Sequence, residues 1–233
     1  MRLADVFGAD NILWVEGTTE EQCFPLILEK VAHRPLMGTA IIGVRHTGDF
    51  QGKPKHKQLI FDIYTRLSSG KGLLPPAIAF VFDRETLSEQ DCDDLEHQSN
   101  GLVSFLPRRM YENYLLHSAA IAALMNTIEG FRETPVAPQE IEEWLDTNGW
   151  DTKYLSSSMS RESERGVAWF ENVDGAKLLK NLFSKLSEAR VVYDNKPEYG
   201  QALTLWLIEH DPNTLQDVAT FLTGILEKNA DMP

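Results

Sequence analysis

Residues 12–21 read ILWVEGTTEE, a short apolar run that ends at Glu16 and Gly17 and is followed by a polar, acidic segment. The apolar run predicts a strand, and the two threonines followed by two glutamates predict the start of a capped helix. Pro25 comes early in the apolar stripe of that helix, so we expect a kink or a late helix start there. A strand that leads directly into a helix is typical of α/β folds.

Three further apolar runs extend this pattern, at residues 40–44, 77–82 and 102–106. Residues 59–67 between them have helical spacing, and residues 88–97 form an acidic stretch that predicts a solvated helix. The run AIAFVF at residues 77–82 is apolar on both faces, which is typical of a central parallel strand. We therefore expect an α/β fold, with an open sheet of mostly parallel strands flanked by helices.

Beyond Tyr111 the strand patterns stop and helical patterns take over. They cover residues 117–128, 139–146, 174–186, 199–209 and 214–227. We therefore expect an α/β core at residues 1–116 and a helical C-terminal half at residues 117–233, packed on the core.

The composition narrows the classes of function. The chain has 233 residues and a net charge of −13, so it lacks the overall basic charge of many nucleic-acid-binding proteins. Two cysteines, Cys23 and Cys92, exclude a disulfide framework and a multi-cysteine zinc site. There is no signal-peptide pattern and no apolar run of the roughly 20 residues that span a bilayer. We expect a soluble, cytoplasmic protein without a membrane partner.

Acidic residues stand where three of the predicted strands end. Glu16 closes the first strand, with Glu20 one helical turn beyond; Asp83 closes the third, with Glu85 two residues on; Glu112 lies just past the fourth. The carboxyl ends of parallel strands meet at one edge of a sheet, so these carboxylates are expected to converge there. Hard divalent cations such as Mg²⁺ or Mn²⁺ would relieve their repulsion. For each acid taken singly, capping of the next helix is an equally good explanation.

Two of these segments resemble the motifs of the Toprim (topoisomerase–primase) fold. Residues 15–20, VEGTTE, resemble its first motif, a strand followed by Glu-Gly and a second acid. Residues 80–85, FVFDRE, resemble its second motif, a strand that ends in acid-x-acid. The Glu-x-x-x-Glu form and residues 111–115, YENYL, are similar to the overcoming-lysogenization-defect (OLD) nucleases and related phage-defence nucleases. The resemblance covers residues 11–116 and extends faintly to residues 174–177, DGAK.

The resemblance implies a Toprim-like fold and a metal-dependent nuclease that uses two cations. By position in the motifs, Glu16 and Glu20 would bind one cation and Asp83 would bridge both, while Glu85 and Glu112 would complete the second site. The second motif is often Asp-x-Asp in this family, whereas here it reads Asp-Arg-Glu. The longer side chain of Glu85 keeps the charge but changes its reach toward a metal.

Several basic residues are candidates for contacts with nucleic acid. Lys177, in the DGAK segment, would by resemblance offset charge at the scissile phosphate, although an exposed helix lysine is an equal alternative and Lys180 is placed similarly. Phosphate-gripping residues are expected after the second and fourth strands, at Arg45, Lys53, Lys55, Lys57, Arg108 and Arg109. A solvated loop after the second strand, and pairing of the two arginines with local acids, remain open alternatives. His46 is a weaker candidate for a general base or metal ligand.

Other chemistries find no support in the sequence. Residues 70–72, GKG, lack the spacing of a nucleotide-binding P-loop, and neither cysteine has the surroundings of a nucleophile. We expect a Mg²⁺- or Mn²⁺-dependent endonuclease that cleaves nucleic acid, DNA rather than RNA, in phage defence together with an ATPase region or subunit absent from this sequence. The alternative is a catalytically silent Toprim-like module that binds an ATPase.

Overall fold

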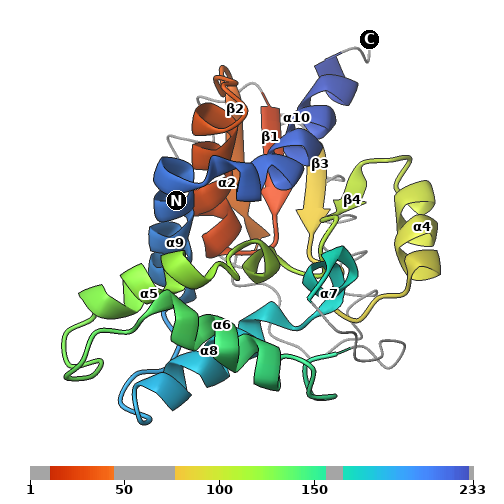
Figure 1. Cartoon of the computed structure of the whole chain (residues 1–233). Coiled ribbons are helices and arrows are strands. Elements are labelled where there is room, and N and C mark those ends of the chain that lie inside the picture. The colour runs from red at the N-terminus through yellow and green to blue at the C-terminus, as the bar shows by residue number, and fades with distance from the viewer. Residues whose placement is uncertain (1–10, 45–76, 156–164, 231–233) are drawn as a thin grey trace. The chain divides into compact units, whose positions relative to one another are not determined.

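The computed structural model describes residues 11–44, 77–155 and 165–230, and among these residues four parallel strands form one sheet (Figure 1). The strands are β1 (Asn11–Val15), β2 (Thr39–Gly43), β3 (Ala77–Phe82) and β4 (Val103–Phe105), in the order β2-β1-β3-β4. The register pairs Val15 with Gly43 on one side and with Val81 on the other. The predicted α/β sheet is confirmed. The chain places β2 on one side of β1 and β3 on the other, so the strand order reverses between β1 and β3 while all strands stay parallel.

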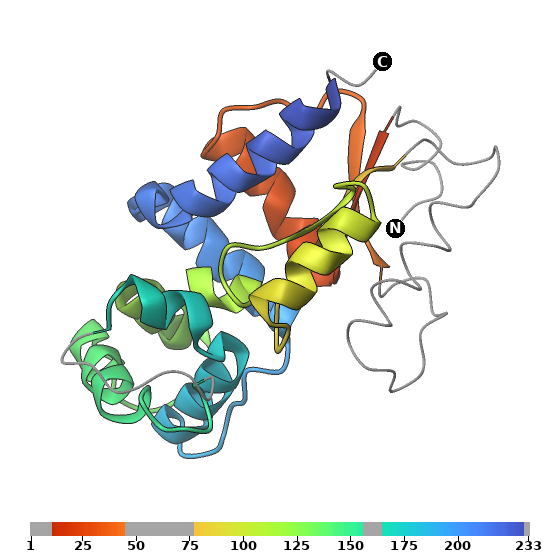
Figure 2. The same ribbon diagram turned by 90° about the vertical axis from the view of Figure 1, so that its right-hand side faces the viewer.

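Helices cover both faces of this sheet. On one face, α4 (Glu89–Gln98) buries Cys92 and Leu95 against aromatic side chains that alternate along the strands, including Trp14, Phe80 and Phe82. On the other face lie α2 (Thr18–Lys30) and α10 (Gln216–Ala230), which pack against β2 and β3 respectively (Figure 2). Burial of each large apolar side chain stabilises the fold by roughly 1.5–3 kcal/mol. The sheet therefore holds the strand ends on a rigid base.

Helix α2 corrects the expectation of a late helix start at Pro25. The helix begins at Thr18 and continues through Pro25 to Lys30. Proline cannot donate a hydrogen bond to the carbonyl of Glu21, a loss that commonly breaks a helix. Here the neighbouring side chains Phe24 and Ile27 are fully buried, and this burial outweighs the missing bond.

In the described part of residues 108–214, all regular secondary structure is helical, which agrees with the helical C-terminal half that the sequence predicts. They contain the 3₁₀ turn η2 (Tyr111–Tyr114), and then α5 (Ser118–Thr127), α6 (Pro138–Asn148), α7 (Val167–Asn172), α8 (Gly175–Leu186) and α9 (Lys196–His210), before η3 (Pro212–Leu215). Helix α7 was not predicted, because six residues are too few to show a periodic pattern. Helix α8 begins after Asp174, as the sequence indicates.

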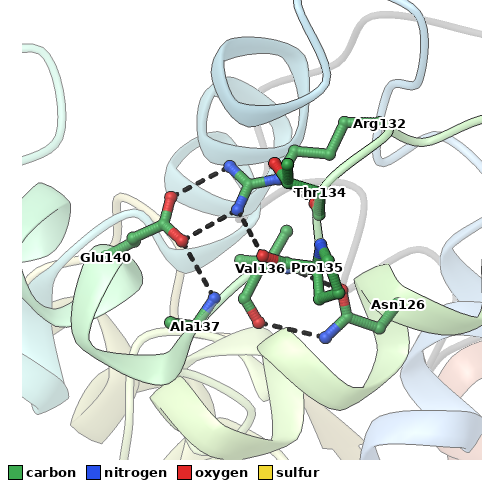
Figure 3. A network of polar contacts seen from close by, with 7 residues as sticks. All are labelled: Asn126, Arg132, Thr134, Pro135, Val136, Ala137 and Glu140. Carbon is green, nitrogen blue, oxygen red and sulfur yellow. Dashed lines mark hydrogen bonds and ion pairs between the residues drawn. The ribbon is translucent and has the colours of Figure 1, made fainter.

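A polar network fixes the loop between α5 and α6 (Figure 3). The amide of Asn126 both donates to the Val136 carbonyl at 3.0 Å and accepts from the Val136 N–H at 2.7 Å. The guanidinium of Arg132 donates two hydrogen bonds to the carboxylate of Glu140, at 2.9 and 2.8 Å. Glu140 also accepts from the N–H of Ala137, and these bonds hold the pKa of its carboxyl at about 2.

The chain forms two compact units. The first comprises residues 1–107 and 215–233, which include the sheet, and the second comprises residues 108–214. The last helix, α10, thus belongs with the sheet although it is most distant from it in sequence. The predicted boundary after residue 116 differs from this division and stays a prediction of where the α/β core ends.

Within the described residues, no helix combines the length and the apolar character that a membrane span requires.

Candidate active site at the strand ends

Glu16 and Asp83 meet at the point where the strand order reverses. They directly follow β1 and β3, which are neighbours in the sheet, and the backbone N–H of Asp83 donates to Oε2 of Glu16 at 3.2 Å. Open parallel sheets bind ligands outside the carboxyl ends of their strands at such a reversal. Glu16 is 9% exposed, so a carboxylate is held at the rim of the core. The predicted approach of these two strand ends is present in the structure.

Glu20 lies in the first turn of α2, and its side chain points back to Gly17, the residue that precedes the helix. Its Oε2 accepts a hydrogen bond from the N–H of Gly17 at 3.0 Å, which satisfies one of the free amide groups at the helix start. This is the helix-capping role that the sequence left open as an alternative. Glu20 is 8% exposed, and so a second buried carboxylate lies beside the end of β1.

Glu85 follows Asp83 in a turn with unusual backbone geometry. Its φ angle is +46°, the left-handed region that residues other than glycine rarely adopt, and the turn is closed by a hydrogen bond from the Leu87 N–H to the Arg84 carbonyl. Such strain costs about 1 kcal/mol and concentrates at functional sites. Asp83 and Glu85 are both partly exposed, so both carboxylates are accessible to solvent.

The chemistry of these side chains suits a hard divalent cation, because all of them offer carboxylate oxygens. In the part of the chain that the structure describes, however, no three or more His, Cys, Asp or Glu side chains are grouped so as to hold a metal ion. Glu16 and Glu20 are engaged by backbone N–H groups instead. The predicted two-cation site therefore stays a prediction.

Glu112 belongs to the second compact unit, where it is paired with a lysine. It lies in η2, is 5% exposed, and accepts a hydrogen bond and ion pair from Nζ of Lys196 at 2.7 Å. Sequence reasoning missed Lys196, which is 84 residues away. One local signal was present: Lys196 is the first residue of α9, and a cation at a helix N-terminus is unfavourable unless another interaction offsets the cost.

Lys177 is exposed in the first turn of α8. Its Nζ donates to the carbonyl of Lys153 at 3.0 Å, and its backbone N–H donates to Asp174, the N-cap of the helix. Lys177 and Glu112 are thus placed within one unit, while Glu16, Glu20, Asp83 and Glu85 belong to the other. Convergence of all of them in a single site stays a prediction.

The two arginines after β4 are held in the second unit. The guanidinium of Arg108 lies over the Tyr114 ring at 4.3 Å and donates to the Asn113 carbonyl. Arg109 lies 3.5 Å from the carboxylate of Asp174, an acid that is distant in sequence rather than one of the local acids that the sequence left open as partners. The other predicted phosphate-binding residues, Arg45, Lys53, Lys55 and Lys57, lie outside the described residues, as does His46.

Both cysteines are buried, and neither forms a disulfide bond. Burial, helped by acidic neighbours such as Glu96, raises the pKa of the Cys92 thiol to about 11. The thiolate, which is the reactive form, is therefore suppressed.

Comparison with known proteins found similarity among solved structures. No protein-family model and no curated protein sequence matches the chain. The C-terminal region of the Burkholderia pseudomallei OLD protein matches with a TM-score of 0.43 at 16% identity, over 91% of this chain and 100% of that one. Two structures of the C-terminal region of the Xanthomonas campestris pv. campestris OLD protein match over 94% of this chain, at 14% identity. They are covered to 98% and 100%, with TM-scores of 0.48 and 0.47. These three solved structures are C-terminal regions of OLD proteins.

Proposed function

We propose that this chain is a Mg²⁺- or Mn²⁺-dependent endonuclease that hydrolyses phosphodiester bonds of nucleic acid, DNA rather than RNA. The observation that carries the proposal is the meeting of Glu16 and Asp83 at the strand reversal, where the Asp83 N–H donates to the Glu16 carboxylate at 3.2 Å. The strained turn at Glu85 and the motif resemblance of residues 15–20 and 80–85 give further support.

The carboxylates Glu16, Glu20, Asp83, Glu85 and Glu112 would hold two cations. When bound, the ions would activate a water molecule and stabilise the leaving oxygen. The chain itself orients the Glu16 carboxylate through the Asp83 backbone and keeps it largely shielded from water, which strengthens its attraction for a cation. Lys177, which is exposed, would offer its ammonium group to a phosphate.

The net charge of −13 sets a condition on substrate binding. Acidic strand ends repel phosphates unless bound cations reverse the local charge. Affinity for nucleic acid should therefore be poor without metal. We further propose that the nuclease acts in phage defence together with an ATPase region or subunit, as the motif resemblance of residues 15–20 and 80–85 implies.

Plasmid nicking by the purified chain tests the proposal. Supercoiled DNA should be nicked in Mn²⁺ or Mg²⁺ and left intact with a chelator. Glu16→Gln and Asp83→Asn keep the side-chain shapes while removing the charges, and each should lower the rate at least about 100-fold. Glu29→Gln, an exposed acid at the far end of the same helix as Glu20, and Glu89→Gln in α4 are matched controls that should retain activity. Cleavage that survives both site substitutions, or that needs no metal, would show the mechanism to be wrong.

A catalytically silent module that binds an ATPase is the second candidate. It is favoured by the hydrogen bonds that engage Glu16 and Glu20 with the backbone, and by the absence of a metal-ligating group among the described residues. Calorimetric titration with Mn²⁺ separates the two. The nuclease should bind two ions per chain and lose binding in Asp83→Asn, whereas the silent module should give no saturable binding that depends on Asp83.

A further inference from the structure

Asn113, the neighbour of Glu112 in η2, joins two distant segments of the second unit. It is 1% exposed, and its Nδ2 donates to the carbonyls of Phe170 at 2.8 Å and of Val173 at 2.9 Å. Its Oδ1 accepts from the N–H of Gly175 at 3.1 Å. Both amide protons and the amide oxygen are thus bonded to the end of α7 and the start of α8. A buried side chain with all its donors engaged resists displacement in either direction.

The same two segments are joined by further bonds on either side of Asn113. The backbone N–H of Arg109 donates to the Glu171 carbonyl at 2.7 Å, and the guanidinium of Arg109 pairs with Asp174. The N–H of Ala176 points to the sulfur of Met110 at 3.3 Å. Residues 109–113 and 171–176 therefore form one tightly bonded assembly, although the Asn113 and Gly175 partners are 62 residues apart.

Gly175 permits this close approach. A Cβ atom at this position would lie 2.4 Å from Oδ1 of Asn113 and 3.1 Å from the carbonyl carbon of Glu112, and the first distance is shorter than real contacts allow. Any side chain at position 175 would push α8 away from the turn that carries Glu112. The close approach of η2 thus explains why the DGAK segment has a glycine at position 175.

The assembly carries the two residues of this unit that are predicted to be catalytic. Glu112 precedes Asn113 in η2, and Lys177 follows Gly175 in the first turn of α8. We propose that Asn113 is a positioning residue, which holds the Glu112 turn on the N-terminus of α8 and so sets the places of Glu112 and Lys177 for cleavage. The inference rests on the proposed nuclease function. Asn113 need not touch substrate or metal, because it acts through the backbone on either side of it.

The alternative is that Asn113 only stabilises the fold, and the chain offers a matched control for this. Asn126 also bonds backbone groups on a loop, at Val136, but neither Asn126 nor Val136 lies within two residues of a predicted site residue (Figure 3). Asn113→Ser and Asn126→Ser should both lower thermal stability. At a temperature where both variants are folded, kcat for nicking should fall at least about tenfold in Asn113→Ser with KM within about twofold, and stay at the wild-type value in Asn126→Ser.

Gly175→Ala disturbs the same contact between Asn113 and residue 175 from the side of α8, and it replaces Asn113→Ser as the test if that variant does not fold. It should reproduce the fall in kcat. Hydrogen exchange gives a readout that does not depend on activity. The amides of residues 175–177 should exchange about tenfold faster in Asn113→Ser than in the wild type, and at the wild-type rate in Asn126→Ser. Unchanged exchange, or a wild-type kcat in folded Asn113→Ser and Gly175→Ala, would overturn the inference while leaving the nuclease intact. A wild-type chain that cuts no DNA would overturn the proposed function, and exchange alone would then decide whether Asn113 couples the segments.

Discussion

The ammonium group of Lys196 lies 2.7 Å from the carboxylate of Glu112, which is only 5% exposed. The lysine side chain itself is 46% exposed, so the pair sits at the boundary between core and solvent. A charge that is buried without a partner is costly, whereas a charge that has one can be nearly neutral in its effect on stability. The pair therefore has testable energetic consequences.

Lys196→Met should lower the free energy of unfolding by about 1–2 kcal/mol, less than the cost of breaking a fully buried pair because water can still reach this site. Adding Glu112→Gln should recover much of the loss, since no unpaired charge then remains. Lys153→Met is the matched control: its partner Asp151 is exposed, and stability should stay close to that of the wild type. Urea denaturation measures all three; equal losses in Lys196→Met and Lys153→Met would contradict the expectation.

Gly43→Ala should disturb the turn that presents Glu16. An added Cβ would lie 2.8 Å from the carbonyl oxygen of Gly17, so β2 and the start of α2 would have to separate. We expect a loss of about 1–3 kcal/mol in unfolding free energy and reduced nicking activity. Gly224→Ala, in α10, meets no atom within 4 Å and should instead add about 0.5–1 kcal/mol through helix propensity. Thermal melts compare the two, and a Gly43→Ala chain as stable as wild type would refute the steric argument.

Lowering the pH should destabilise the loop between α5 and α6, because Glu140 becomes protonated. Hydrogen bonds from Arg132, and then from the Ala137 N–H, lower the pKa of its carboxyl from 4.5 to about 2. Because the folded pKa is depressed, this stabilisation is complete above about pH 4.5 and is lost as the pH falls toward 2. Since the Glu140 side chain is 42% exposed, solvent screening keeps its contribution below about 1 kcal/mol.

Arg132→Met should return the pKa of Glu140 toward 4.5, as read from carboxyl chemical shifts in an NMR titration, and should flatten this part of the acid dependence of stability. Arg190→Met is the control, because its exposed pair with Glu188 is remote in sequence from the loop. A Glu140 titration that is the same in wild type and Arg132→Met would exclude the hydrogen-bonded fork as the cause.

Cys92 should resist alkylation in the folded chain. With a pKa of about 11, the thiolate makes up about a thousandth of the thiol at pH 8, and burial also blocks the reagent. Mass spectrometry after iodoacetamide treatment should find Cys92 unmodified in buffer and fully modified in urea. Rapid modification of Cys92 in the native chain would mean that α4 opens readily or that the thiol is activated.

Local signals in the sequence were enough for much of the fold. Apolar runs marked the strands at residues 77–82 and 12–15, and Asp174 marked the start of α8, because strand burial and N-capping depend on a few adjacent residues. Local rules failed at Pro25, where the burial of Phe24 and Ile27 overrides a helix-breaking residue. The acids Glu16 and Asp83 were found because each directly follows a strand.

The sequence by itself determined which residues could carry chemistry: carboxylates at strand ends and a glycine-lysine segment at the start of a helix. Only the tertiary structure decided how they are held. Lys196 reaches Glu112 across 84 residues, and Asn113 reaches Gly175 across 62, and no periodicity or spacing encodes such pairs. The physical reason is that hydrogen bonds and ion pairs between distant segments depend on the packing that brings those segments together, whereas strands, helices and caps are specified by neighbours along the chain.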